Sequence, residues 1–304
     1  MATPLKIGTR ESPLALVQAE MVAHGLRQKH PALAAEGAIE IVPMTTTGDK
    51  IQDKTLAAAG GKGLFTKELE EALLAGTIDC AVHSMKDMPT VLPPGLAISC
   101  ILPREDPREA FFSRHGGGID DLPKGAVIGS SSLRRQAVLL SLRPDLRMTV
   151  LRGNVGTRLR KLEEGVADAT ILAVAGLKRL GLGHLIKHML EPDIMLPAVA
   201  QGAVGVETRE NDARVISLLA PLNCPISAMR LAGERAFLAI MDGSCRMPLG
   251  ALMGVPDTHG YVSFDVMAAH GDGSNMRKAA YFKKITTISE AEELGREAGL
   301  ALKK

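Results

Sequence analysis

Arginine and serine side chains recur directly after the segments that the sequence predicts to be β-strands. Arg10 and Ser12 follow the first such segment, and a serine triplet followed by Arg134 and Arg135 comes after another. Arginine presents a planar fork of donors suited to carboxylates or phosphates, and free amides and hydroxyls at helix starts also favour anions. One such residue is ordinary, but the recurrence predicts a site for a multiply anionic ligand. The same pattern occurs at Ser84 and Lys86, at Arg152 and Arg158, and at Arg179.

Asp87 is a lone carboxylate within this cationic set. It would repel every carboxylate ligand, so its presence makes sense where a positive charge develops during a reaction. A fixed carboxylate would stabilise such a cation and could pass protons. An ion pair with Lys86, or a helix cap, explains the same residue equally well from the local sequence.

A glycine-rich segment precedes the second predicted helix. It is not a nucleotide phosphate loop, because Gly63 stands where Ser or Thr would have to follow Lys62. Repeated glycine leaves the backbone free to move. Two interpretations remain: a plain glycine turn, or a mobile loop that brings Lys62 and Phe65 over a bound ligand.

The four cysteines, at positions 80, 100, 224 and 245, lie far apart and form no CxxC pair. Neither a zinc cluster nor a disulfide framework is indicated, no metal is expected, and a reducing cytoplasm fits best. Cys245 lies in a predicted tight loop beside Arg246, where positive charge favours the thiolate. It is either a nucleophile or covalent attachment point, or an ordinary small buried side chain.

Length and charge exclude several classes of protein. A chain of 304 residues is expected to form two or three domains. Its net charge is only +2, from 36 basic and 34 acidic side chains, which argues against a general nucleic-acid binder. The first residues do not resemble a secretory signal, and the most apolar stretch, 169–177, is too short to span a bilayer. We therefore expect a cytoplasmic protein that binds neither nucleic acid nor membrane.

Short β-like segments alternate with amphipathic helices through the first two-thirds of the chain. This βαβ order predicts two α/β halves with mostly parallel sheets, joined by a crossover at 103–108. Ligands bind beyond the carboxyl ends of strands in such sheets, so a cleft between the halves is expected. Strands are predicted at 5–9, 39–45, 78–82, 96–102, 127–129, 148–151 and 169–174, and helices at 12–30, 64–75, 132–142 and 156–165.

The character of the sequence changes from Pro225 onward. A helical face carrying Met229 and Phe237 is followed by strands predicted at 249–255, 261–268 and 276–284 and by a helix from Ser289. This part is predicted to be a small α+β domain. The expected domains are therefore 1–102 with 203–220, then 108–196, and finally 225–304, which carries Cys245.

A series of stretches from Thr9 to Gly250 resembles, in order, the porphobilinogen deaminase family. The resemblance implies three α/β domains, the first two similar to a bilobal periplasmic-binding-protein fold. The matching stretches are TRESPLALVQAE, GGKGLFTKELE, AVHSMKDMP, REDPREAF, GSSSLRRQ, LRGNVGTRL, ILAVAGLKRLG, LPAVAQGAVGVE, GERAFL and DGSCRMPLG.

The resemblance also implies an activity and a cofactor. The implied enzyme is a monomeric transferase that condenses four porphobilinogen molecules head to tail into hydroxymethylbilane, with release of ammonia. A dipyrromethane cofactor would be attached through a thioether to Cys245, and Asp87 would be the catalytic aspartate. The resemblance assigns the acetate and propionate groups of cofactor and substrate to Arg10, Arg134, Arg135, Arg152, Arg158 and Arg179. It assigns cleft-lining positions to Ser12, Lys62, Phe65, Ser84, Lys86, Ser131, Ser132 and Gln201.

Two departures and two alternatives accompany this interpretation. Ala58 stands where many relatives carry a lysine, and the cysteine loop reads GSC where a second glycine is common.

A non-catalytic anion-binding protein of the same bilobal fold would explain the arginines but gives no role to Asp87 or Cys245. A nucleic-acid module using the Arg134–Arg135 helix conflicts with the charge balance and with only 3% aromatic residues.

Overall fold

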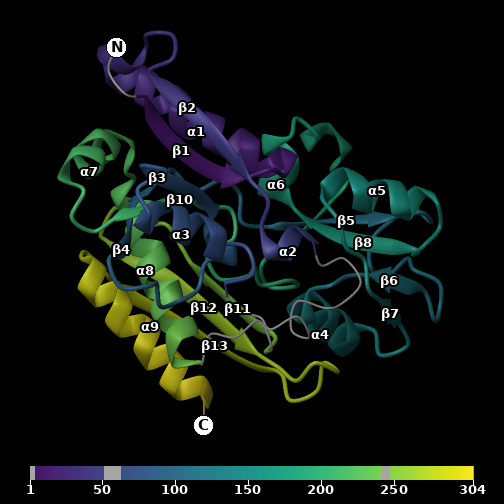
Figure 1. The fold of residues 1–304 in the computed structure, drawn as a ribbon. Helices are drawn as coiled ribbons and strands as arrows, with labels where there is room; N and C mark the ends of the chain where they lie inside the picture. Colours follow the sequence, from purple (N-terminus) through teal and green to yellow (C-terminus); the bar gives the residue numbers. More distant parts are fainter. Residues whose placement is uncertain (1–3, 51–62, 242–246, 304) are drawn as a thin grey trace. The chain divides into compact units, whose positions relative to one another are not determined.

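The computed structural model describes residues 4–50, 63–241 and 247–303 (Figure 1). Lys62, Cys245 and Ala58, named above, lie outside these ranges. The chain divides into two compact units. Among the described residues it passes from unit 1 to unit 2 between Glu105 and Asp106, returns between Gly202 and Ala203, and passes to unit 2 again between Ala228 and Met229. Of the described residues, unit 1 comprises 4–50, Gly63–Glu105 and Ala203–Ala228, and unit 2 comprises Asp106–Gly202, 229–241 and 247–303.

Unit 1 is built on a five-stranded mixed sheet with the strand order β2-β1-β3-β10-β4. Strand β1 pairs in parallel with β2 and β3, whereas β10 runs antiparallel to both β3 and β4. The parallel strands therefore end at a common edge of the sheet. The strands are β1 (Leu5–Arg10), β2 (Ile39–Met44), β3 (Cys80–Ser84), β4 (Leu96–Ile101) and β10 (Val204–Arg209).

Two apolar clusters hold the helices of unit 1 against this sheet. Val22 and Leu26 of α1 pack in one cluster with β1, β3 and β10, and Leu69 and Leu73 of α3 pack in a second. Helix α1 begins at Pro13 because the Ser12 side chain accepts a hydrogen bond from the backbone at the third helical residue. The helices are α1 (Pro13–Lys29), α2 (Thr47–Lys50), α3 (Lys67–Leu74) and α7 (Ala213–Leu219), with 3-10 turns at Pro31–Leu33, Met85–Asp87 and Ala220–Leu222.

The first sheet of unit 2 repeats the arrangement of unit 1. Its order is β7-β6-β8-β5-β9, with β6 parallel to β7 and β8, and β5 antiparallel to β8 and β9. Strands β5 and β10 each follow a passage between the units and enter the fourth position of their sheet. The shared architecture of the two halves is thus confirmed. The strands are β5 (Glu109–Ser113), β6 (Val127–Gly129), β7 (Arg147–Thr149), β8 (Ala169–Ala173) and β9 (His188–Leu190).

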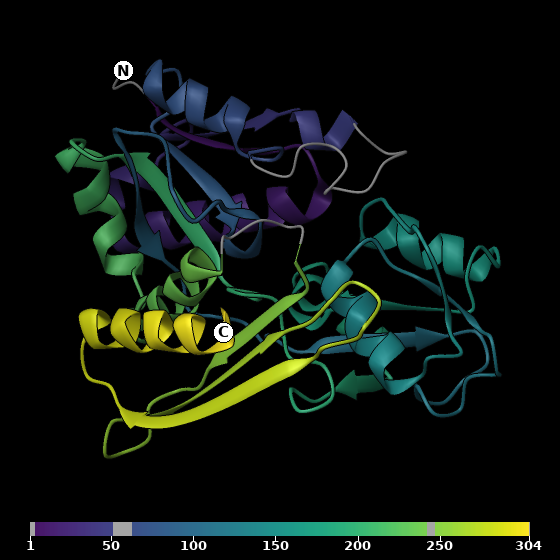
Figure 2. The ribbon, with the colours of Figure 1, turned by 90° about the horizontal axis from the view of Figure 1, so that it is seen from below.

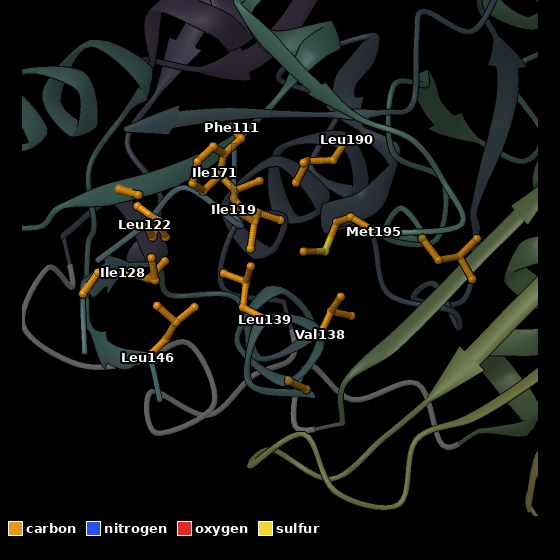
Figure 3. Close-up of a cluster of buried hydrophobic side chains, with 14 of the residues drawn as sticks. Phe111, Ile119, Leu122, Ile128, Val138, Leu139, Leu146, Ile171, Leu190 and Met195 are labelled. Carbon is orange, nitrogen blue, oxygen red and sulfur yellow. The ribbon is translucent and has the colours of Figure 1, made fainter. Parts of the chain in front are cut away.

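Capped helices follow the parallel strands of this sheet. Ser132 caps α4, and Asn154 caps α5 by accepting a hydrogen bond from the Thr157 amide at 2.9 Å. Figure 3 shows the core beneath α4, in which Phe111, Ile128 and Leu139 are buried. The helices are α4 (Leu133–Leu142), α5 (Val155–Glu163) and α6 (Val174–Arg179), followed by a 3-10 turn at Gly183–Leu185.

The C-terminal part forms a small antiparallel sheet with two helices, as the sequence predicted. Figure 2 shows α9 lying along this sheet, and Phe237 of α8 packs edge-on against Phe264 with ring centroids 6.4 Å apart. Helices α8 and α9 cross so closely that a Cβ at Gly295 would lie 2.1 Å from the Gly233 carbonyl oxygen. The elements are α8 (Pro225–Ile240), β11 (Leu249–Met253), β12 (Tyr261–Ala268), β13 (Arg277–Lys284) and α9 (Ile288–Lys303).

The structure corrects three local expectations. Both five-stranded sheets are mostly parallel, as expected, but each contains one antiparallel strand, β10 in the first and β5 in the second, and strands β5, β9 and β10 were not predicted. Strand β3 begins at Cys80, two residues later than expected. The helix expected from residue 64 begins at Lys67, since the Thr66 and Lys67 amides both donate to the Gly63 carbonyl and form a turn there.

Among the described helices, no single one has both the length and the apolar composition that a membrane span requires. One pair has both jointly, Ala213–Leu222 with Pro225–Ile240, and its two helices are bent by 107°.

Candidate active site

In unit 1, the predicted site residues lie at the carboxyl ends of two adjacent parallel strands. Arg10 is the last residue of β1, and Ser84 is the last residue of β3. Lys86 and Asp87 belong to the 3-10 turn that follows β3, and Ser12 caps the helix that follows β1. Because β1 and β3 are neighbours in the sheet, the structure brings these residues to one edge.

The turn that carries Asp87 is anchored on both sides. Ser84 and Gln18 of α1 exchange hydrogen bonds between their side chains at 2.9 and 3.0 Å, and Gln18 is buried. The Met85 amide donates to the Ala203 carbonyl at 3.0 Å. Asp87 and the adjacent lysine are exposed, so a fixed backbone presents both side chains to solvent.

Behind this turn lies a buried polar cluster that the sequence did not reveal. The His83 imidazole lies 2.9 Å from a carboxylate oxygen of Glu207, and both side chains are buried. Glu70 of α3 is buried as well. Burial raises the pKa of Glu70, and the charge of Glu207 raises it further. The only signal in the sequence is that His83 and Glu207 lie in strands that otherwise read as apolar.

Arg10 contacts a carboxylate and an aromatic ring of its own chain. Its Nε donates to Oδ2 of Asp49 at 3.2 Å, and a terminal nitrogen donates to Oδ1. The guanidinium carbon lies 4.2 Å from the centroid of the Phe65 ring. Burial opposes the ionisation of Asp49, but hydrogen bonds from Arg10 and Thr46 outweigh it and hold the pKa of Asp49 below its usual value.

In unit 2, Arg134 and Arg135 lie in the first turn of α4, and both are buried. Each of them forms an ion pair with Glu109 of β5, which is fully buried. Arg134 also donates to the Leu196 carbonyl at 2.7 Å. Two guanidinium groups on one carboxylate leave a net positive charge at the start of α4. The sequence showed the arginines, but not that an acidic residue 25 positions earlier would pair with them.

Burial also affects the protonation of Arg134. It lowers the pKa of this guanidinium, and the charge of Arg135 lowers it further, while Glu109 opposes both. The guanidinium group of an arginine nevertheless stays protonated in proteins at neutral pH. Within the described residues, the Nε atom of Arg134 is buried without a hydrogen-bond partner.

The ends of β6 and β7 hold four more of the predicted residues. The Ser131 hydroxyl donates to the Leu151 carbonyl at 3.0 Å, which ties the segment after β6 to the segment after β7. Ser132 caps α4, and the Arg158 Nε donates to the Gly153 carbonyl at 2.8 Å. Arg152 precedes α5 and is half-buried. These residues are therefore together at one edge of the second sheet.

The two remaining predicted residues lie at the return passage between the units. Gln201 is buried, and its side-chain amide donates to the Pro107 carbonyl at 2.7 Å, so it links the return passage to the first passage, at residues 105–106. Arg179, the last residue of α6, donates to the Gly202 carbonyl at 2.7 Å.

Ala200, next to Gln201, adopts a left-handed backbone with φ of 60°. Glu234 of α8 is fully buried, and its carboxylate accepts hydrogen bonds from the amides of Ala200 at 2.7 Å and Met253 at 2.9 Å. The carboxylate thus holds the strained residue in place and ties it to β11. Sequence reasoning missed this role, although Glu234 lies within a stretch that carries the family resemblance.

Comparison with known proteins identifies the family. A family model described as "Porphobilinogen deaminase, dipyromethane cofactor binding domain" matches residues 5–217, and one described as "Porphobilinogen deaminase, C-terminal domain" matches residues 228–304. The chain belongs to the porphobilinogen deaminase family. The porphobilinogen deaminase of Paracoccus denitrificans (strain Pd 1222) is 58% identical over 249 residues, which are 82% of this chain and 79% of that protein. The chloroplastic porphobilinogen deaminase of Oryza sativa subsp. japonica is 48% identical over 303 residues, 98% of this chain and 83% of that protein.

Solved structures of other families show weaker likenesses. An ancestral cationic amino acid solute binding protein has a TM-score of 0.43 and 14% identity, covering 72% of this chain and 88% of that one. A YaeC-family lipoprotein from Enterococcus faecalis V583 has a TM-score of 0.42 and 12% identity, covering 80% of this chain and 98% of that one. The porphobilinogen deaminases above are far more similar in sequence.

Membership of the porphobilinogen deaminase family confirms the enzymatic prediction. The chain is a transferase that condenses four porphobilinogen molecules into hydroxymethylbilane with release of ammonia. The predicted dipyrromethane cofactor is confirmed too, because the model matching residues 5–217 is the binding domain for that cofactor. The alternative of a non-catalytic anion-binding protein rests only on similarity of fold.

Proposed function

We propose that Asp87 and the guanidinium groups at the strand ends are the working groups of this porphobilinogen deaminase. One observation carries the proposal. Cationic side chains follow the carboxyl ends of parallel strands in both five-stranded sheets, and in unit 1 the exposed carboxylate of Asp87 lies in the turn directly after β3. In α/β sheets this edge is where ligands bind.

The proposed donors suit the carboxylates of cofactor and substrate. Guanidinium groups bind carboxylates bidentately, and the N-termini of α1, α4 and α5, capped by Ser12, Ser132 and Asn154, add polar groups that favour anions. This donor set therefore fits a cofactor that bears several carboxylates. The residues proposed to bind acetate and propionate groups are Arg10, Arg134, Arg135, Arg152, Arg158 and Arg179, with Ser84, Lys86, Ser131 and Gln201 as further contacts.

We assign Asp87 the chemical step. Loss of ammonia from porphobilinogen leaves positive charge on the pyrrole, and a nearby carboxylate stabilises that charge. The same carboxylate can hold the proton that ammonia needs to depart and later accept the proton released when the new carbon–carbon bond forms. The anchoring of its turn through Ser84 and Met85 keeps the Asp87 backbone in one position.

We further propose that Cys245 carries the cofactor through a thioether and that Lys62 and Phe65 cover the bound pyrroles. Lys62 and Cys245 lie outside the described residues, and Phe65 contacts Arg10. When bound, the cofactor serves as the primer to which the first porphobilinogen is joined. This chain's contribution is to hold the primer's carboxylates.

We also propose that the protein is a cytoplasmic monomer and that nucleic acid is not a partner. A monomer is sufficient, because one chain supplies every residue named above. A cytoplasmic location fits Cys80 and Cys100, which are buried free thiols. The net charge of +2 disfavours nucleic acid as a partner. Light scattering of the purified protein tests the monomer directly.

The intact mass of the purified protein tests the proposed attachment. Wild-type protein is expected to carry a covalent adduct of two pyrrole units, and the Cys245→Ser variant is expected to lack both the adduct and the turnover of porphobilinogen. Cys224→Ser is the matched control and should keep both. Full turnover by the Cys245→Ser variant, or an adduct mapped by peptide analysis to another residue, would refute the assignment.

A further inference from the structure

We propose that Asp49 lowers the affinity of Arg10 for a substrate or cofactor carboxylate by competing with that carboxylate for the guanidinium group. The inference rests on the proposed function, in which Arg10 binds such a carboxylate. The bidentate geometry between Arg10 and Asp49 is the arrangement that an arginine adopts with a bound carboxylate ligand. An internal carboxylate thus occupies the place that the ligand needs.

The groups around Arg10 favour a ligand carboxylate that replaces Asp49 over one that binds beside it. Phe65 lies against one flat side of the guanidinium, and Asp49 occupies the edge formed by Nε and a terminal nitrogen. A second carboxylate on the remaining edge would lie close to the Asp49 charge. Like charges at such short range repel each other, so exchange is favoured over simultaneous binding.

Asp49 can leave Arg10 without losing all its partners. Its carboxylate also accepts hydrogen bonds from the hydroxyl of Thr46 at 2.7 Å and from the amide of that residue at 3.3 Å. The pKa of Asp49 lies below its usual value, so the group remains an ionised competitor at neutral pH. After exchange it would keep the two contacts with Thr46, and these reduce the cost of releasing Arg10.

The segment 46–49 is built to hold Asp49 at this point. Thr47 donates from its amide and hydroxyl to Glu68 at 2.9 and 2.6 Å, and the Gly48 amide donates to the Leu64 carbonyl at 2.6 Å. Residue 48 has to be glycine, because a Cβ there would lie 2.3 Å from the Phe65 ring. The same contact that seats Phe65 beside Arg10 therefore fixes the backbone next to Asp49.

The expected strength of the competition is modest. The Arg10 and Asp49 side chains retain 21% and 25% of their exposure, and partly exposed ion pairs are only moderately stable. The affinity of a ligand that must displace such a partner is reduced in proportion to the fraction of time that Arg10 is not paired with Asp49. We expect the competition to weaken binding about 3- to 10-fold.

The test compares the KM for porphobilinogen in Asp49→Asn and wild-type enzyme. We expect KM to fall about 3- to 10-fold with kcat changed less than about 2-fold, because Arg10 is released while the reacting groups are untouched. Asp49→Ser should give the same result if the asparagine variant folds poorly. The matched control is Glu20→Gln, which removes the exposed Arg27–Glu20 ion pair of the same unit and should leave KM unchanged.

A double-mutant cycle with Arg10→Gln decides whether the effect passes through Arg10. We expect Asp49→Asn to leave KM unchanged in the Arg10→Gln background. An equal fall in KM there, or an unchanged or raised KM in the folded single variants, overturns the role of Asp49. A wild-type KM in the Arg10→Gln variant itself would instead refute the proposed function, in which Arg10 binds a carboxylate, so the two failures are distinguishable.

Discussion

Glu109 of β5 and Arg135 of α4 form a buried bidentate ion pair, with Nε 3.0 Å from one carboxylate oxygen and a terminal nitrogen 2.7 Å from the other. Glu109 is fully buried, and Arg134 contacts the same carboxylate. The pair fixes the first turn of α4 to the sheet while leaving a net positive charge. The guanidinium groups proposed to bind pyrrole carboxylates are thereby oriented before any ligand arrives.

Replacing Glu109 by Gln should therefore destabilise the protein strongly. Removing one partner of a buried pair leaves uncompensated charge, and the expected loss is about 3–5 kcal/mol in the free energy of unfolding. Chemical denaturation measures it. Glu191→Gln serves as control, because Glu191 pairs with Arg108 but is half exposed and should cost less than about 1 kcal/mol. An equal effect of the two substitutions would contradict the structural role of Glu109.

Asp87→Asn should abolish most turnover without disturbing the fold. The amide cannot carry the proton or the charge assigned to Asp87, so kcat is expected to fall at least about 100-fold. The adduct mass and the thermal unfolding temperature should match the wild type, because Asp87 is exposed. Asp120→Asn, at another exposed aspartate, is the control. Turnover near the wild-type rate in the Asp87 variant would refute the catalytic assignment.

Arg152→Ala should impair cofactor assembly or chain elongation. Loss of a charge-assisted hydrogen bond to a carboxylate is expected to weaken binding about 10- to 100-fold. Intact mass reports cofactor content, and trapped intermediates report elongation. Arg160→Ala removes an exposed arginine of the neighbouring helix that pairs with Glu164 and should change neither. If both variants behave like the wild type, Arg152 does not bind the cofactor or the growing chain.

The buried cysteines make stability depend on alkaline pH. Burial raises the pKa of Cys80, with a further contribution from Asp79, and burial alone raises that of Cys100; both reach about 12. Unfolded thiols ionise near pH 8.5. Because the folded state keeps protons that the unfolded chain loses, this contribution is complete below that pH and declines as pH rises toward 12.

The unfolding temperature should accordingly fall between pH 9 and pH 11, and less steeply in the Cys80→Ala variant. In native protein at pH 8, iodoacetamide should modify Cys224 while sparing Cys80 and Cys100, since Cys224 is half-buried and the other two are buried. Peptide mass analysis identifies the modified residues. Rapid modification of Cys80 in folded protein would contradict the raised pKa.

Local sequence signals predicted the parallel strands of both five-stranded sheets except β9. Strand β6 and strand β12 have the predicted bounds, and α1 begins where Ser12 and Pro13 indicated. These elements show clear periodicity and caps, which are local properties. The antiparallel strands β5 and β10 were not predicted. Strand β10, for example, pairs with β3 across more than a hundred residues, and a pairing over that distance has no hairpin turn in the sequence to indicate it.

The same limit applies to the candidate site. The sequence identified Arg10, Arg134 and Arg135, because arginine at a strand end is visible without a structure. It did not identify Asp49 or Glu109, since an acidic partner is recognised only when folding places it beside the guanidinium. The cleft-lining position that the resemblance assigns to Gln201 stays a prediction, whereas the hydrogen bond from its side-chain amide to the Pro107 carbonyl is visible only in the structure.

The placement of β10 affects the order in which the protein folds during synthesis. Strands β3 and β4 pair with β10, which is translated about a hundred residues after β4. A nascent chain that ends near residue 105 therefore exposes two unpaired strand edges, and such edges promote aggregation. The N-terminal sheet is expected to close only after residue 209 has left the ribosome, so chaperone dependence should be greatest while the intervening half is being translated.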